Sequence, residues 1–137
     1  MSTLTLKHYE HITKDLVPLV VEAQRSLVSG MPPYEELPEG EKQFSQKAVV
    51  AYHEDVPVGI FLFSVYSKTL EGVLAYVKPE YRRMGCYTLM LNGLVEEAKR
   101  RDLANIVVYV DIDNQVSNKT QLAVGFKHIM NVYSYTI

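Results

Sequence analysis

The sequence is poor in the features that mark secreted, metal-bound and membrane-spanning proteins. Its 137 residues include a single cysteine, which cannot form an internal disulfide. Cysteine and histidine clusters with the spacing of a zinc site are missing, so we expect no metal site. No uncharged apolar run reaches the length that spans a bilayer, and the N-terminus has no long apolar region of a signal peptide. These absences favour a reducing, cytoplasmic location.

An excess of charge of one sign is also missing. The chain has 14 Lys and Arg residues against 16 Asp and Glu residues, which gives a net charge of −2. This balance offers no broad attraction for nucleic acid or an anionic membrane, so neither is an expected partner. Hydrophobic residues make up 47% of the chain, which is ordinary for a globular protein. The length predicts one domain, residues 1–137.

What the sequence does contain is a regular alternation of strand and helix patterns. Strands are expected over residues 3–7, 48–53, 58–66, 69–77, 106–112, 126–130 and 132–137. The polar turn Glu54-Asp55-Val56-Pro57 predicts that the second and third of these strands form a hairpin. Helices are expected over 12–27, 85–101 and from Asp113 or Asn114 to about Gly125, and residues 34–46 form a short helix or an ordered loop. The outer face of the helix 85–101 is expected to carry Asn92, Glu96, Glu97, Lys99, Arg100 and Arg101. Pro18 fits the first turn of its helix if Thr13 or Asp15 is the cap. The strand 106–112 is apolar apart from Asp111, as in a strand covered on both faces.

The segment between the strand 69–77 and the helix 85–101 is the most informative one. It runs Val77-Lys78-Pro79-Glu80-Tyr81-Arg82-Arg83-Met84-Gly85-Cys86-Tyr87. The first amides of a helix have no intrahelical acceptor and lie at the positive end of its dipole, so anions are favoured there. Two arginines add positive charge, and a glycine allows close approach of the backbone. This turn therefore predicts a phosphate-binding site.

The same segment resembles the acyl-coenzyme A signature of the GNAT superfamily of N-acyltransferases, Arg/Gln-x-x-Gly-x-Gly/Ala, often preceded by Val-x-Pro-x-Tyr. Arg82-x-x-Gly85-x-Tyr87 agrees except at the last position, where a tyrosine replaces a small residue. A second match is Asn114 followed by Gly125-Phe126. The predicted order β-α-α-β-β-β-α-β-α-β-β is that of the family, an α/β fold whose central mixed sheet has helices on both sides. The resemblance covers nearly the whole chain.

The resemblance implies an enzyme that transfers an acyl group, most simply from acetyl-CoA, directly to a primary amine of a small molecule or a protein lysine. Tyr76 and Val77 would offer backbone groups to the pantetheine arm and the thioester. The implied coenzyme-binding residues are Tyr76, Val77, Arg82, Arg83, Met84, Gly85, Cys86, Tyr87 and Asn114. The glutamates at 35, 36, 39 and 41 lie where relatives bind the acceptor, which hints at a cationic acceptor.

Direct transfer to an amine requires a base, because a protonated amine cannot attack. Glu71, on the strand that leads to the phosphate turn, is the first candidate, and Asp111 is the second. Relatives often carry a proton-donating tyrosine where this chain has Gln121. Tyr133, Tyr135 or Tyr109 would have to substitute, or the thiolate would leave unassisted.

Two residues of the turn allow opposite interpretations. Tyr87 either joins the apolar face of its helix or narrows the coenzyme site. Cys86 is either a reactive thiol at a helix start or, as we expect, a small buried side chain. An obstructive Tyr87 together with Gln121 would favour a second hypothesis, a GNAT-like binding or assembly module without catalysis. A nucleotide-binding protein is a weaker third, because no P-loop is present. The apolar terminal strands could pair in a homodimer.

Overall fold

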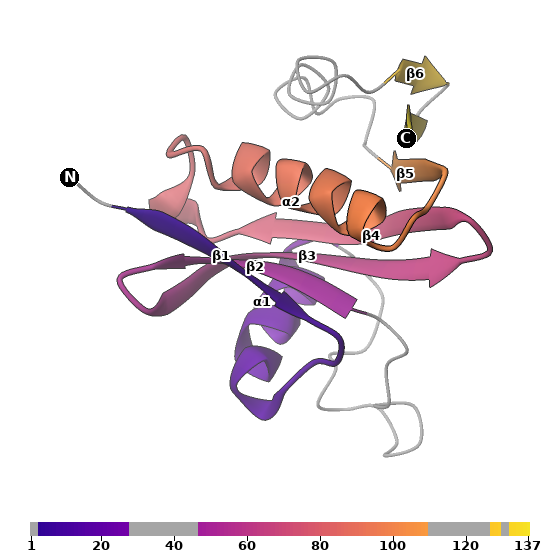
Figure 1. The fold of residues 1–137 in the computed structure, drawn as a ribbon. Helices are drawn as coiled ribbons and strands as arrows, with labels where there is room; N and C mark the ends of the chain where they lie inside the picture. The colour runs from indigo at the N-terminus through magenta and orange to yellow at the C-terminus, as the bar shows by residue number, and fades with distance from the viewer. Residues whose placement is uncertain (1–2, 28–46, 110–126, 130–131) are drawn as a thin grey trace.

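The computed structural model describes residues 3–27, 47–109, 127–129 and 132–137 (Figure 1). The described strands form one mixed sheet in the order β1-β2-β3-β4-β5-β7-β6. Their bounds are Leu4–Tyr9 (β1), Lys47–His53 (β2), Val56–Tyr66 (β3), Thr69–Val77 (β4), Asn105–Tyr109 (β5), Lys127–Ile129 (β6) and Val132–Thr136 (β7). The helices are α1 (Val17–Leu27) and α2 (Cys86–Arg100), with the short 3₁₀ helices η1 (Lys14–Leu16) and η4 (Pro79–Tyr81).

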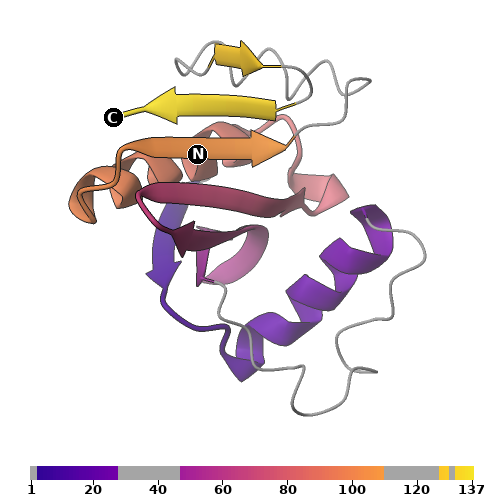
Figure 2. The same cartoon turned by 90° about the vertical axis from the view of Figure 1, so that its right-hand side faces the viewer.

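Helices cover both faces of this sheet. In Figure 1, α2 lies on one face and α1 on the other. Of the strand pairs described, only β4 and β5 run parallel, and α2 makes the crossover between them. Figure 2 shows β5, β7 and β6 following one another toward the edge of the sheet. The predicted mixed α/β architecture is confirmed, whereas the predicted third helix and the helix or loop at 34–46 lie outside the described residues.

Local sequence explains the first half of the fold. Glu54 and Asp55 have φ angles of 51° and 69°, the left-handed conformation of a two-residue hairpin turn between β2 and β3. This confirms the predicted hairpin. The predicted first helix is divided into η1 and α1, and Pro18 lies in the first turn of α1, where its missing N–H costs nothing. The apolar side of α1, including Leu19 and Ala23, packs on the sheet with Ile60.

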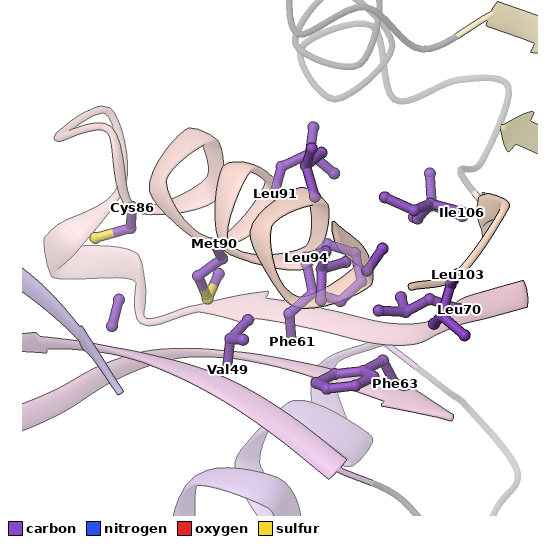
Figure 3. Close-up of a cluster of buried hydrophobic side chains, with 14 of the residues drawn as sticks. Val49, Phe61, Phe63, Leu70, Cys86, Met90, Leu91, Leu94, Leu103 and Ile106 are labelled. Carbon is purple, nitrogen blue, oxygen red and sulfur yellow. The ribbon is translucent and has the colours of Figure 1, made fainter. Parts of the chain in front are cut away.

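The second and larger core lies between α2 and the sheet. Met90 and Leu94 point from α2 toward the sheet (Figure 3), and both are completely buried, as is Leu91. Phe61 and Phe63 of β3 belong to the same cluster. Fully burying side chains of this size stabilises a fold by about 1.5–3 kcal/mol each. This packing, more than any helix propensity, holds the start of α2 at the end of β4.

One predicted feature of α2 is wrong. The helical pattern assigns Glu97 to the outer face of α2, yet its side chain is only 2% exposed. β1 covers this part of the helix, and His8 Nδ1 lies 3.0 Å from Glu97 Oε2. Arg101 Nε donates to Glu97 Oε1 at 2.9 Å, and Arg100 donates to the same oxygen. A carboxylate can be buried here because cationic donors satisfy it.

β4 and β5 pair over only part of their length. Thr69–Gly72 pair with Asn105–Val108, after which β4 continues to Val77 without a β5 partner among the described residues. The pairing with β3 is interrupted at this point by a β-bulge, in which Val73 has no partner residue in β3. Val73 is 43% exposed although it belongs to an inner strand. We call this last part of β4, which has no β5 partner among the described residues, the open edge of β4.

β5 is less covered than its composition predicts. Ile106 and Val108 are buried against α2, whereas Val107 on the opposite face is only partly buried. The second face of a central strand is closed only if another element packs there, and α1 lies against β3 and β4 instead. Residues 110–112 of the predicted strand lie outside the described residues.

The packing at Gly72 gives a first prediction. A Cβ atom added there would meet Phe61 Cε1 at 2.8 Å and Val108 Cγ1 at 2.9 Å. We expect Gly72→Ala to lower the free energy of unfolding by about 1–3 kcal/mol, because it overpacks the core where β4 leaves β5. Urea or thermal unfolding measures this. Gly59→Ala is the matched control, since its nearest neighbour is the flexible end of Met90 at 3.3 Å. Equal effects of the two substitutions would contradict the proposed steric cause.

Candidate functional site

The turn after β4 is anchored to the neighbouring strand β3. Lys78 N–H donates to the Val58 carbonyl at 2.9 Å, and Tyr81 N–H donates to the Lys78 carbonyl at the same distance. Pro79 opens η4 with a φ angle already suited to a helical turn. These bonds hold the turn at the end of β4, so the residues that follow it start α2 from a defined point.

The start of α2 has an unusual backbone. Arg83 and Gly85 have φ angles of 63° and 86°, a left-handed conformation that glycine adopts at no steric cost. Leu89 N–H donates to the Gly85 carbonyl at 3.0 Å. The backbone amides of residues 85–88 therefore precede the first intrahelical hydrogen bond of α2. A Cβ atom at Gly85 would have no neighbour within 4 Å. The space beside Gly85 on the side of this Cβ position is open.

Two exposed arginines border this open space. Arg82 Nε donates to the Val77 carbonyl at 3.0 Å, and its Cζ lies 5.8 Å from the centroid of the Tyr76 ring. The side chain thus folds over the end of β4. Its terminal N–H groups bond to none of the described residues. Arg83 and Met84 are also exposed. An exposed helix start with two guanidinium groups is suited to bind phosphate oxygens.

The orientation of Tyr87 is settled by its contact with β3. Its ring centroid lies 5.8 Å from that of Phe61, with an angle of 32° between the planes. Phe61 belongs to the core beneath α2. The ring therefore joins the apolar side of the helix, as the first of the two interpretations predicts. It does not take the place of the missing small residue in front of the turn.

Cys86 is a buried side chain, as expected. It is 2% exposed, and its Sγ lies 3.6 Å from the Tyr81 carbonyl. Figure 3 shows it at the beginning of α2, at one end of the apolar cluster. Burial raises the pKa of the Cys86 thiol, because the thiolate is disfavoured away from water. The reactive-thiol interpretation is thereby excluded.

The face of β4 that is turned toward α1 carries the first predicted base. Glu71 is partly buried and pairs in register with Ser64 of β3 and Val107 of β5. Its neighbours Leu70 and Gly72 face α2, so strand alternation places Glu71 on the α1 face. It precedes by one residue the point at which the pairing with β5 ends. A carboxylate is thus positioned at the base of the open edge.

Tyr76 and Val77 fall on the open edge itself. The Tyr76 side chain is buried on the α1 face, and its hydroxyl donates to Glu22 Oε2 at 2.6 Å. This side chain is thus engaged with α1, and only its backbone remains for the predicted contact. Sequence reasoning missed Glu22. The signal was its place on α1 next to the buried face that holds Leu19 and Ala23.

Several predicted site residues are not placed by the structure. Asp111, Asn114 and Gln121 lie outside the described residues. The backbone of Tyr133 pairs with Val108 in the β5–β7 ladder. Within the described ranges, no group of three or more metal-ligating side chains is found, and no helix is long and apolar enough to cross a bilayer.

Comparison with known proteins agrees with this geometry. Residues 16–126 match the Acetyltransferase (GNAT) family, and the chain belongs to that family. No curated protein shows significant sequence similarity to it.

Three solved structures illustrate the likeness of the fold. The ribosomal-protein-S18-alanine N-acetyltransferase of Escherichia coli has a TM-score of 0.80 at 14% identity, over 98% of this chain and 94% of that one. An N-acetyltransferase of Staphylococcus aureus Mu50 has a TM-score of 0.73 at 16% identity, over 98% of this chain and 99% of that one. The PaiA N-acetyltransferase of Thermoplasma acidophilum, in complex with coenzyme A, has a TM-score of 0.70 at 15% identity, over 97% of this chain and 99% of that one. At such identities the likeness establishes the fold.

The burial of Cys86 predicts slow modification of its thiol. Because its pKa is raised in the folded state, the thiolate fraction at neutral pH is smaller than in the unfolded chain. Because the pKa is raised on folding, the neutral thiol favours the folded state below the pKa of the unfolded chain. This contribution is lost as the pH rises through the pKa of the folded state. Iodoacetamide should alkylate the native protein far more slowly than the chain unfolded in guanidinium. Equal rates in the two states would contradict the buried position.

Proposed function

We propose that this protein transfers an acyl group, most simply acetyl from acetyl-CoA, directly to a primary amine. The observation that carries the proposal is the exposed turn of Arg82 to Gly85, placed where β4 has lost its pairing with β5. The family assignment supports acyl transfer as the reaction class. The alternative of a non-catalytic binding module loses its main support, because Tyr87 packs on Phe61 and leaves the turn open.

The residues of the turn fit the phosphates of an acyl-coenzyme A. Gly85 lies beside open space, and the amides around it would bind the pyrophosphate oxygens. The terminal N–H groups of Arg82 and the exposed Arg83 would neutralise the charge of the phosphates. Met84, Cys86 and Tyr87 contribute through the backbone of the same turn, and Asn114 remains a proposed contact from the segment after β5.

The open edge of β4 fits the remainder of the donor. An unpaired strand edge presents backbone N–H and C=O groups that bind an extended, amide-containing chain in the manner of an additional strand. Tyr76 and Val77 lie on the part of β4 that has no β5 partner among the described residues. Their backbone groups would align the amide-containing arm of the coenzyme, which places its thioester nearer to Val73 and Glu71.

The chemistry then depends on proton transfer and alignment. When bound, the donor supplies an acyl thioester, whose carbonyl carbon bonds to the amine nitrogen while the carbon–sulfur bond breaks. Glu71 accepts the proton that the amine must lose, directly or through a water molecule. Asp111 is the second candidate for this role, and Tyr133 is the proposed donor of a proton to the leaving sulfur. Alignment of amine and thioester on one strand contributes much of the rate.

The phosphate site is tested by binding of acetyl-CoA, measured by calorimetry. The wild type should bind, and Arg82→Ala combined with Arg83→Ala should weaken binding about tenfold or more, because two cationic partners of the phosphates are lost. Binding of the wild type should also weaken as the salt concentration rises.

Lys14→Ala combined with Lys99→Ala is the matched control for this experiment. It removes the same charge from two exposed positions on η1 and α2, away from the turn. Thermal unfolding of both double variants checks that the fold is retained, which matters because Arg82 also bonds to the Val77 carbonyl. A wild type that binds no acetyl-CoA would support the non-catalytic alternative.

The base is tested by Glu71→Gln, which keeps the shape of the side chain and removes its basicity. We expect kcat to fall by about 10²–10⁴-fold with acetyl-CoA affinity unchanged. Glu80→Gln serves as the control, since Glu80 is an exposed carboxylate close to the turn. A full kcat in Glu71→Gln would move the role to Asp111, and Asp111→Asn would then be measured.

A further inference from the structure

Glu22 has an unusual environment for a carboxylate. It is partly buried on α1, and its Oε2 accepts a hydrogen bond of 2.6 Å from the neutral hydroxyl of Tyr76. Glu10, Glu96 and Glu97 have cationic partners, whereas Glu22 has none among the residues that the structure describes. A carboxylate whose one described partner is a neutral hydroxyl keeps further acceptor sites, which suit a cationic donor.

Tyr76 connects this carboxylate to the proposed reaction site. The Tyr76 side chain comes from the open edge of β4, donates to Glu22 on α1, and lies under the guanidinium of Arg82. Glu22 therefore lies beside the end of β4, on the face that also carries Glu71. The two carboxylates therefore border the same side of one strand.

The spacing along β4 separates the roles of these two residues. Glu71 and Tyr76 pair with Ser64 and Ile60 of β3, which are four positions apart. At a rise of about 3.3 Å per residue, their Cα atoms are roughly 13 Å apart along the strand. A single ammonium group cannot contact a base at one end and Glu22 at the other. A charge bound by Glu22 must then belong to a distant part of the acceptor.

We propose that Glu22 binds a second positively charged group of the acceptor, and that the acceptor is a long, multiply protonated amine. The inference rests on the proposed function and adds the substrate class to it. Glu22 is the specificity-determining residue, and Tyr76 is a positioning residue that holds the carboxylate by its hydroxyl. The reacting amine is deprotonated near Glu71, while the second ammonium stays charged and bonds to Glu22.

Spermidine and n-butylamine are suitable probes, because they share a primary amine and only spermidine carries distant positive charges. We expect wild-type protein to bind spermidine about tenfold more tightly than butylamine, as one charge-assisted hydrogen bond would allow. Glu22→Gln should remove this preference. Binding is measured by calorimetry, with and without coenzyme A. In turnover, Glu22→Gln should raise KM for spermidine about tenfold and leave kcat within about twofold.

Glu96→Gln is the matched control, because it removes the same charge from an exposed position on α2. It should keep the preference for spermidine. Tyr76→Phe should raise KM for spermidine less than Glu22→Gln does, since the carboxylate remains and only its hydrogen bond is lost. If Glu22→Gln lowers thermal stability but keeps the preference, the pair only docks α1 on the sheet, and the proposal is overturned. A wild type without any preference overturns it as well.

The outcome can be separated from that of the proposed function. Failure of wild-type protein to bind acetyl-CoA would reject the acyl-transfer proposal, whatever the amines do. Loss of spermidine preference in Glu22→Gln, with acetyl-CoA affinity unchanged, supports the role of Glu22 within that function. Spermidine preference without coenzyme binding would identify a polyamine-binding protein in which Glu22 recognises the charge.

Discussion

The end of the pairing between β4 and β5 is the constraint on which the rest of the structure depends. Parallel strands normally pair along their full length, because each unpaired backbone group loses a hydrogen bond. Here the described pairing stops at Gly72 and Val108. Overpacking is avoided at this point only because Gly72 has no side chain, with Phe61 and Val108 filling its place. The freed edge of β4 leads directly to the turn that begins α2.

Two kinds of contact hold α2 on the sheet and so keep that turn in position. Beneath α2 the interaction is apolar, with Met90 and Leu94 completely buried. At the far end of α2 it is ionic, because Glu97 bonds to Arg101 and approaches His8 of β1. A helix held at both ends transmits little motion to its first turn. Such a fixed helix start would lower the ordering cost of binding the proposed phosphate ligand.

Three tyrosines have different structural roles because their surroundings differ. Tyr87 departs from the signature of the family, but its ring contributes to the core and leaves the turn open. Tyr76 belongs to the proposed donor site through its backbone, while its hydroxyl bonds to Glu22 of α1. Tyr52 bonds to Tyr9 through their hydroxyl groups and lies in the apolar layer beneath α1. None of these three roles follows from composition.

The sequence by itself determined the described strands, the helix α2, the hairpin at Glu54-Asp55 and the position of the turn before α2. These features depend on hydrophobic periodicity and turn chemistry, which act over a few neighbouring residues. Only the tertiary structure decided the burial of Glu97, the orientation of Tyr87 and the meeting of Glu22 with Tyr76. Each of these depends on contacts between segments far apart in the chain, as with the 54 positions that separate Glu22 from Tyr76. A local pattern carries no information about which distant side chain will fill the space beside it.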